Sequence, residues 1–330
     1  MTTRQKTILR QSVTIAFYAA IVLFLVLYLR RIDWESLKDI RIHWGMLGIA
    51  GLFGVAFRFW GAYIWLVLLK SLGAKNLRGS RRQLVQVYAK SWLGRYIPGT
   101  APWILGKIYF ASQHGVSKNK LAVSALLEGA LQLVVLLAVS FVMLVSDDRL
   151  HNIDSGTRWL VVGVLVACVM TLVPSVFNGI ISTAHRILRK KPLDVQHLAS
   201  GKTIVQGALL YLVGAVLSGL SFYFITKAIW PSVNAGDALF IMGAGNFSGA
   251  ISMLAICAPS GIGVREGVLL VLLGMIIPPE AALAATVLSR VWGIVMDFVF
   301  FGLGSALGMR NNGPTANAEL DPQSSSRAEL

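Results

Sequence analysis

Two short interruptions of an apolar chain combine helix-breaking residues with ionised side chains. The first, residues 94–102, contains Arg95, and the second, residues 258–267, contains Arg265 and Glu266. Irregular backbone at membrane depth is stable only where protein buries it or a water-filled cavity meets it. Cationic side chains beside free backbone N–H groups can bind an anionic group such as phosphate. The chemistry that these residues predict is the binding of a charged ligand within a membrane.

Proline and glycine should form the turns of both interruptions and supply hinge points and backbone donors. The residues expected in this role are Pro98, Gly99, Pro259, Gly261 and Gly263. Glycine allows tight turns because it has no Cβ. Paired Gly/Pro interruptions in the two halves of a membrane protein are the best sequence indication of a transport site.

Ionisable residues within apolar spans are functional candidates because their burial in lipid is costly. We expect headgroup contacts from five cations: Arg58, Arg95, Lys107, Arg265 and Arg290. We expect charge balance or proton coupling from three carboxylates: Glu128, Glu266 and Asp297. The structural alternative for these residues is a set of buried ion pairs: Glu128 with Arg58 or Lys107, and Arg290 with Glu266 or Asp297. Both interpretations stay open at the level of sequence.

Composition indicates a polytopic membrane protein. The chain has 330 residues, of which 55% are hydrophobic and only 14% charged, against roughly 25% charged residues in soluble domains. The net charge of +15 is explained by loops that set orientation and meet anionic lipid headgroups, so no nucleic-acid partner is expected. Cys168 and Cys257 lie in apolar stretches and are expected to be buried thiols. The sequence predicts no metal site and no cofactor.

The hydropathy pattern predicts an all-α fold with about six transmembrane helices and two re-entrant helical hairpins. The predicted spans cover residues 13–29, 45–69, 121–145, 159–177, 203–229 and 281–309. The interruptions lie in two further apolar stretches, 84–110 and 237–277, which are predicted to form the hairpins. Residues 1–310 should form one membrane domain, followed by a disordered polar tail at 311–330.

Loop charges predict the orientation of the chain. Basic residues gather before the first span and in the regions 70–90 and 178–202, which the positive-inside rule places in the cytoplasm with both termini. The two hairpins then enter from opposite faces, which is the arrangement of an inverted repeat. A basic amphipathic segment at 178–192 should lie on the inner membrane surface.

The two interruptions and their surroundings resemble the lysylphosphatidylglycerol synthase transmembrane, or flippase-like, family. The residues similar to its first signature are Pro98-Gly99, Lys107, Gly115-Val116-Ser117 and Leu126-Leu127-Glu128. Those similar to its second signature are Pro259, Gly261, Gly263, Glu266, Gly274 and Arg290. The first signature is degraded, because Ala101-Pro102 replaces the usual glycine pair and Gly129 replaces an arginine.

The resemblance implies a role in lipid translocation. Bifunctional members of the family flip aminoacylated phosphatidylglycerol, which an attached cytosolic synthase domain makes. Only a short tail follows Arg310 here, so we expect a stand-alone transporter and no enzyme. The expected cargo is an anionic or polyprenyl-linked lipid of the inner (cytoplasmic) membrane, and enzymes of envelope glycan or lipid biosynthesis are candidate partners.

Two other functions remain open from the sequence. One is a membrane partner or enzyme subunit of a lipid-carrier glycosyltransferase pathway, and the other is a transporter of small solutes or ions. No His-Glu-x-x-His or Gly-x-Ser-x-Gly motif occurs, and no catalytic residue is predicted. The Ser-x-x-Lys spacing at Ser117 and Lys120 lacks its companion motifs and is interpreted as chance.

Overall fold

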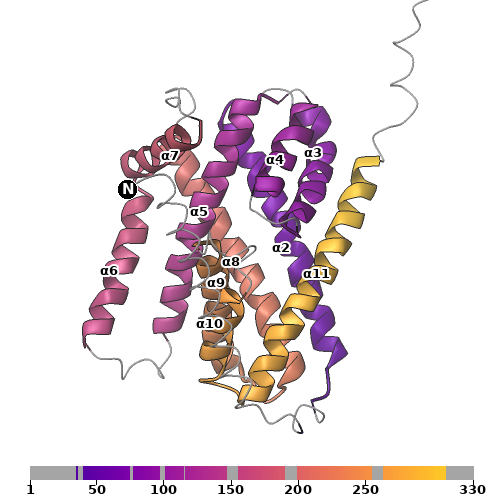
Figure 1. The fold of residues 1–330 in the computed structure, drawn as a ribbon, viewed down its shortest axis with the longest axis vertical. Helices are drawn as coiled ribbons and strands as arrows, with labels where there is room; N and C mark the ends of the chain where they lie inside the picture. Colours follow the sequence, from indigo (N-terminus) through magenta and orange to yellow (C-terminus); the bar gives the residue numbers. More distant parts are fainter. Residues whose placement is uncertain are drawn as a thin grey trace, which may run out of the picture.

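The computed structural model describes residues 35, 40–74, 77–96, 101–114, 116–146, 155–189, 199–254 and 263–309, and all regular structure within them is helical. The helices in chain order (Figure 1) are α2 (Trp44–Ser71), α3 (Leu77–Trp92), η2 (Leu93–Tyr96), α4 (Ala101–Ser112), α5 (Lys118–Val145), α6 (Ser155–Thr171), α7 (Pro174–Arg189), α8 (Gly201–Ile229), η5 (Ala235–Asp237), α9 (Ala238–Leu254), α10 (Val264–Leu273) and α11 (Pro279–Met309).

Five helices in the described part of the chain are long and apolar enough to cross a membrane. They are α2, α5, α8, α9 together with η5, and α11, and the number rises to six if the bent pair α6–α7 forms one span. The all-helical membrane class is thus confirmed, and four of the predicted spans coincide with α2, α5, α8 and α11. The first predicted span, 13–29, and the tail, 311–330, lie outside the described residues.

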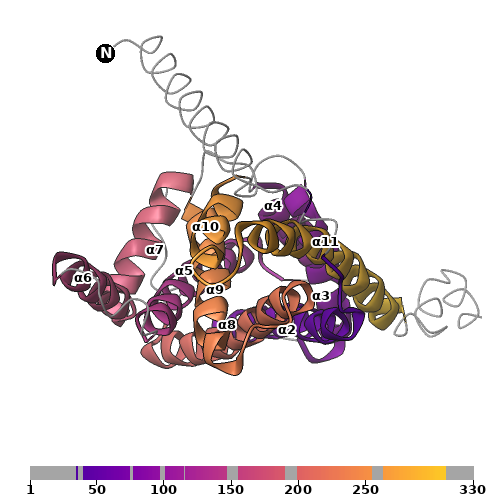
Figure 2. The same ribbon diagram turned by 90° about the horizontal axis from the view of Figure 1, so that it is seen from below.

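The fourth predicted span is broken near its end. α6 and α7 meet at an angle of 80°, because Pro174 begins a new helix and proline disfavours helical backbone in the residue before it. Phe177 and Ile181 of α7 are buried against the bundle. The Asn178 side chain bonds both backbone groups of Ala199, at 2.9 and 3.0 Å. α7 is therefore fixed across the end of the bundle, at its periphery with α6 (Figure 2).

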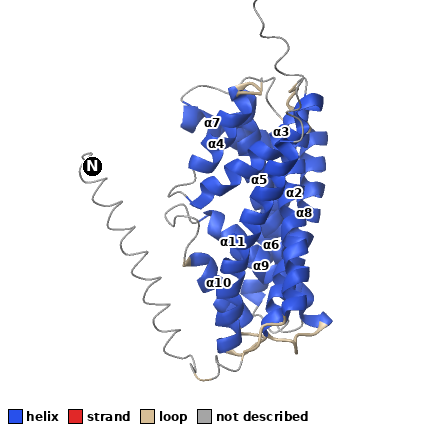
Figure 3. Cartoon of the chain, turned by 90° about the vertical axis from the view of Figure 1, so that its right-hand side faces the viewer, coloured by secondary structure: helices blue, strands red, loops and turns tan. Residues whose placement is uncertain are grey.

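The two interrupted stretches form helix pairs in different parts of the molecule. The second pair differs from the hairpin predicted for 237–277, because α9 with η5 is long and apolar enough to cross a membrane by itself. α3 packs against α4, and α9 packs against α10. The first pair occupies the upper part of Figure 1 and the second the lower part, and Figure 3 shows α4 and α10 toward opposite ends. The connecting segments 97–100 and 255–262 lie outside the described residues, and with them the predicted hinge residues Pro98, Gly99, Pro259 and Gly261.

The core of the bundle brings the functional candidates onto a common scaffold. α2 packs along α8, α5 along α9, and α11 along α3. One buried cluster, between α2, α3 and α11, is rich in aromatic rings and includes Trp65, Tyr88, Trp92 and Phe300. Three of these rings lie beside buried charges: Trp65 and Tyr88 face the Lys107 ammonium, and Trp92 donates to Asp297.

Glycine lets α11 approach α3 closely. A Cβ at Gly304 would lie 2.7 Å from the Cβ of Ala89, and one at Gly308 would overlap the Gln86 side chain. Small residues four apart are the usual means of close helix packing in membranes, where van der Waals contact replaces the hydrophobic driving force. Gly304 and Gly308 therefore set the position of α11, the helix that carries Arg290 and Asp297.

Replacing Gly304 by Ala should destabilise the bundle, whereas the same change at Gly302 should not. A Cβ at Gly302 meets no atom within 4 Å, and alanine is favoured over glycine in a helix by about 1 kcal/mol. At Gly304 the new Cβ would also overlap the Ala89 side chain, and such overpacking typically costs about 1–3 kcal/mol of stability. Thermal unfolding in detergent, followed by tryptophan fluorescence, measures the difference. Equal stability of the two variants would contradict tight packing of α11 on α3.

Candidate functional site: a buried arginine cluster

The carboxylate of Asp297 accepts hydrogen bonds from three other structural elements. Its Oδ1 accepts hydrogen bonds from Arg58 Nε on α2, at 2.5 Å, and from Trp92 Nε1 on α3, at 2.8 Å. Its Oδ2 accepts from the Tyr96 hydroxyl of η2, at 2.5 Å. Asp297 itself belongs to α11 and is 3% exposed. One buried carboxylate therefore holds α2 and the first interruption against α11.

Arg58 is engaged on several sides. Besides its ion pair with Asp297, at 2.5 Å, it donates from Nη1 to the Gly54 carbonyl and from Nη2 to the Gly293 carbonyl, each at 2.8 Å. Arginine presents five N–H donors in a rigid fork, and three of its nitrogens are used here. Arg58 is thus held in one orientation between α2 and α11.

A second ion pair joins the start of α10 to α11. Arg290 Nη1 lies 2.9 Å from Glu266 Oε1, and the other Glu266 oxygen accepts the backbone N–H of Gly263 at 2.7 Å. The Gly263 backbone has φ of 84°, a conformation that glycine adopts at no steric cost. The side chains of Arg290 and Glu266 are 32% and 23% exposed, respectively. This pair is accessible, unlike that of Asp297.

Arg95, in the first interruption, and Arg265, in the second, lie close enough for their charges to interact. The Arg95 guanidinium lies 3.5 Å from the centroid of the Trp92 ring, which itself donates to Asp297. Arg265, next to Glu266 in the chain, is within electrostatic range of Arg95. Among the described residues, the Arg265 side chain has no hydrogen-bond or ion-pair partner.

Six side chains thus gather at this place, and we call them the central arginine cluster: Arg58, Arg95, Arg265, Arg290, Glu266 and Asp297. Four guanidiniums and two carboxylates give the cluster a formal charge of +2. The connecting segments 97–100 and 255–262 contribute no charged residue. A protein site with excess positive charge and low exposure is suited to bind an anion.

Lys107 and Glu128 form a separate, enclosed pair. Lys107 Nζ lies 2.5 Å from Glu128 Oε2, and the two side chains are 1% and 2% exposed. The Tyr88 hydroxyl donates to the other Glu128 oxygen at 2.9 Å. The ammonium also faces the rings of Trp103, Tyr88 and Trp65, at 4.2, 4.5 and 5.4 Å from their centroids. Of the two partners considered for Glu128, the structure shows Lys107.

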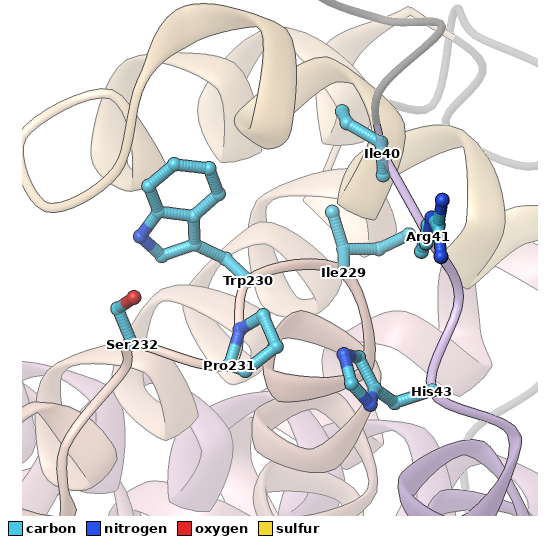
Figure 4. A pocket seen from close by; sticks show the side chains of 7 residues that line it. All are labelled: Ile40, Arg41, His43, Ile229, Trp230, Pro231 and Ser232. Carbon is cyan, nitrogen blue, oxygen red and sulfur yellow. The ribbon is translucent and has the colours of Figure 1, made fainter.

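Two cavities in the described part of the chain lie outside the cluster. A cavity of about 20 Å³ lies between α2, α3, α5 and α8 and is lined by Tyr88, Gln132 and Tyr211 among others. It is large enough for about one water molecule. A larger pocket of about 280 Å³ lies between the start of α2 and the end of α8. There Arg41 and Trp230 lie on opposite sides and do not converge (Figure 4).

A metal centre is not indicated by this part of the chain. The described residues contain no group of three or more His, Cys, Asp or Glu side chains that could hold an ion. The charged groups instead occur as carboxylate–cation pairs. The arrangement is suited to binding and orienting a charged group.

Aromatic donors are the part of the site that the sequence predictions missed. Tyr88, Trp92 and Tyr96 each donate to a buried carboxylate. They occur at intervals of four residues, which places them on one face of a helix. This spacing is a signal in the sequence that identifies the polar face of α3 and η2.

Comparison with known proteins agrees with the helical membrane architecture. The family model of the lysylphosphatidylglycerol synthase TM region matches residues 12–300. The chain belongs to this family. The match includes every member of the central arginine cluster and extends over most of the chain, and it concerns the membrane region of the family. No curated protein matches the sequence.

Removing one partner of the Lys107–Glu128 pair should be more harmful than removing both charges. Lys107→Met or Glu128→Gln leaves an uncompensated buried charge, and such changes typically cost about 3–5 kcal/mol. The double variant leaves no charge, and glutamine still accepts the Tyr88 hydroxyl. Unfolding in detergent of the wild-type chain, the two single variants and the double variant should therefore show the double variant more stable than either single one. Additive losses would contradict a directly coupled pair.

Proposed function

We propose that this protein is a transporter that moves lipids with an anionic headgroup across the membrane. The observation that carries the proposal is the excess positive charge of the central arginine cluster, at the meeting place of the two interruptions. Membership of a family of lipid-handling membrane regions supports the choice of a lipid as cargo. The membrane we propose is the inner membrane, with both termini in the cytoplasm.

The electrostatics of the cluster favour an anionic ligand. Guanidiniums held together in one partly buried site repel each other, because the effective dielectric constant there is lower than in water. A phosphate between them removes this repulsion and accepts charge-assisted hydrogen bonds from both forks. Arg265, which has no hydrogen-bond partner among the described side chains, and Arg290, which is partly exposed, are the residues we assign to headgroup contact.

The remaining charges support this site. Arg58 and Asp297 hold α2, η2 and α11 together, so we assign them to positioning. Lys107 and Glu128 are enclosed and fix α4 to α5. Arg95 adds positive potential beside Trp92. Among the carboxylates, Glu266 is the most accessible and is the one we assign to any proton coupling.

Movement of a lipid headgroup through the protein requires that its binding site be exposed to each side of the membrane in turn. We propose that α3–α4 and α9–α10 are re-entrant hairpins of an inverted repeat. Their location toward opposite ends of the molecule supports this (Figure 3), as does the loop charge. The headgroup would pass between them while its chains stay in lipid. The hinges would be Pro98, Gly99, Pro259, Gly261 and Gly263, the proline and glycine residues of the interruptions.

Reconstitution into liposomes tests the proposal. Fluorescent phosphatidylglycerol in the inner leaflet should become accessible to a membrane-impermeant quencher when the protein is present. Arg290→Gln should slow this movement about tenfold, equivalent to about 1.4 kcal/mol of lost binding in the rate-limiting state. Lys202→Gln is the matched control, because Lys202 is exposed at the start of α8 and the change in net charge is the same.

The outcome also separates the alternative functions. Movement of no anionic lipid, or equal rates for the Arg290 and Lys202 variants, would overturn the proposal. Uptake of a soluble anion without lipid movement would indicate a solute transporter. Support of a lipid-linked glycosylation reaction in detergent, where transbilayer movement has no meaning, would indicate a partner of a glycosyltransferase.

A further inference from the structure

We infer that the central arginine cluster selects a headgroup with a doubly charged phosphate, either a phosphomonoester or a diphosphate. The inference rests on the proposed function and narrows its substrate class. It separates this chain from a carrier of aminoacylated phosphatidylglycerol, whose headgroup includes a cationic amine. The observations that carry it are the charge of the cluster and the number of donors that remain available in it.

The net charge of the cluster matches that of a dianion. The six side chains of the cluster sum to +2, and the segments 97–100 and 255–262 add no charge to it. The neighbouring Lys107–Glu128 pair is neutral as a whole. A phosphodiester brings one negative charge, whereas an ionised phosphomonoester brings up to two. The dianion is therefore the better match for the cluster.

The N–H donors available in the cluster also suit a phosphomonoester. Arg265 has no hydrogen-bond partner among the described residues, and Arg290 makes its one described ion pair through Nη1 alone. Each guanidinium has five N–H groups in a planar fork. A phosphomonoester has three terminal oxygens that can accept from two such forks, whereas a phosphodiester has two. The donor set is larger than a phosphodiester can use.

The two carboxylates of the cluster already have partners. An aminoacyl headgroup would need an acidic partner for its ammonium group. Asp297 already accepts from Arg58, Trp92 and Tyr96. Both oxygens of Glu266 are also in use, by Arg290 and by the backbone of Gly263. An added cation would therefore meet a site of positive charge whose two carboxylates are engaged.

Binding of short-chain lipids to the purified full-length chain tests the inference. The probes are dihexanoyl phosphatidic acid, dihexanoyl phosphatidylglycerol, its lysyl ester and inorganic phosphate. At pH 8, the Kd for phosphatidic acid should be about tenfold lower than the Kd for phosphatidylglycerol. The lysyl ester should bind more weakly than either.

Measurement at pH 5 adds a check on the charge of the ligand. A phosphomonoester loses its second proton at a pH of about 6, so phosphatidic acid changes charge between the two conditions while phosphatidylglycerol does not. The arginines stay protonated throughout. The charged groups within electrostatic range of Arg265 are Glu266, Arg290, Arg95 and Arg58, and none of them is a histidine. The preference for phosphatidic acid should therefore shrink at pH 5.

Variants at position 265 distinguish a ligand contact from a structural role. Arg265→Gln should reduce the affinity for phosphatidic acid to that for phosphatidylglycerol, and Arg265→Lys should retain part of the preference. Lys202→Gln should leave both affinities unchanged, because its exposed side chain lies on the first turn of α8. A preference that survives in Arg265→Gln would overturn the assignment of this residue.

The results separate this inference from the proposed function. Equal affinity of the wild-type chain for phosphatidic acid and phosphatidylglycerol, with lipid movement intact, would overturn the dianion inference alone. Tight binding of inorganic phosphate without movement of any lipid would support dianion selection and assign it to a soluble ligand, which overturns lipid transport. Tightest binding of the lysyl ester would overturn the inference in favour of an aminoacylated headgroup.

Discussion

The burial of ionised groups in an apolar bundle is the constraint on which the rest of this structure depends. A charge removed from water is tolerated only when a partner and hydrogen bonds replace the lost hydration. Asp297 meets this condition with donors from Arg58, Trp92 and Tyr96. Because these donors come from α2, α3 and η2, satisfying one carboxylate fixes the relative positions of those elements and α11.

The same constraint divides the buried charges into two kinds. The Lys107–Glu128 and Arg58–Asp297 pairs are nearly inaccessible and are enclosed by aromatic rings and backbone carbonyls. Arg290 and Glu266 are partly exposed, and Arg265 has no hydrogen-bond partner within the described residues. The enclosed pairs therefore stabilise the scaffold, whereas the accessible arginines remain available to a ligand. This difference, and not the presence of charge alone, locates the candidate site.

Much of the fold was predictable because hydropathy is a local property. Four predicted spans coincide with α2, α5, α8 and α11. The fourth predicted span ends too late, since an apolar run continues through Pro174 although the helix axis turns by 80° there. Average hydropathy does not detect such a bend, but the backbone restriction of proline does. The aromatic face of α3 and η2 is likewise encoded in the four-residue spacing of Tyr88, Trp92 and Tyr96.

The sequence by itself determined the membrane class, the two interruptions and the identity of the buried charges, because each follows from residue types over a short stretch. Only the tertiary structure decided which charges are paired. Glu128 could pair with Arg58 or Lys107 by sequence, and Asp297 is 239 residues from its partner Arg58. Ion pairs act over a few ångströms in space, and helix packing, which glycines such as Gly304 permit, decides which distant residues come within that range.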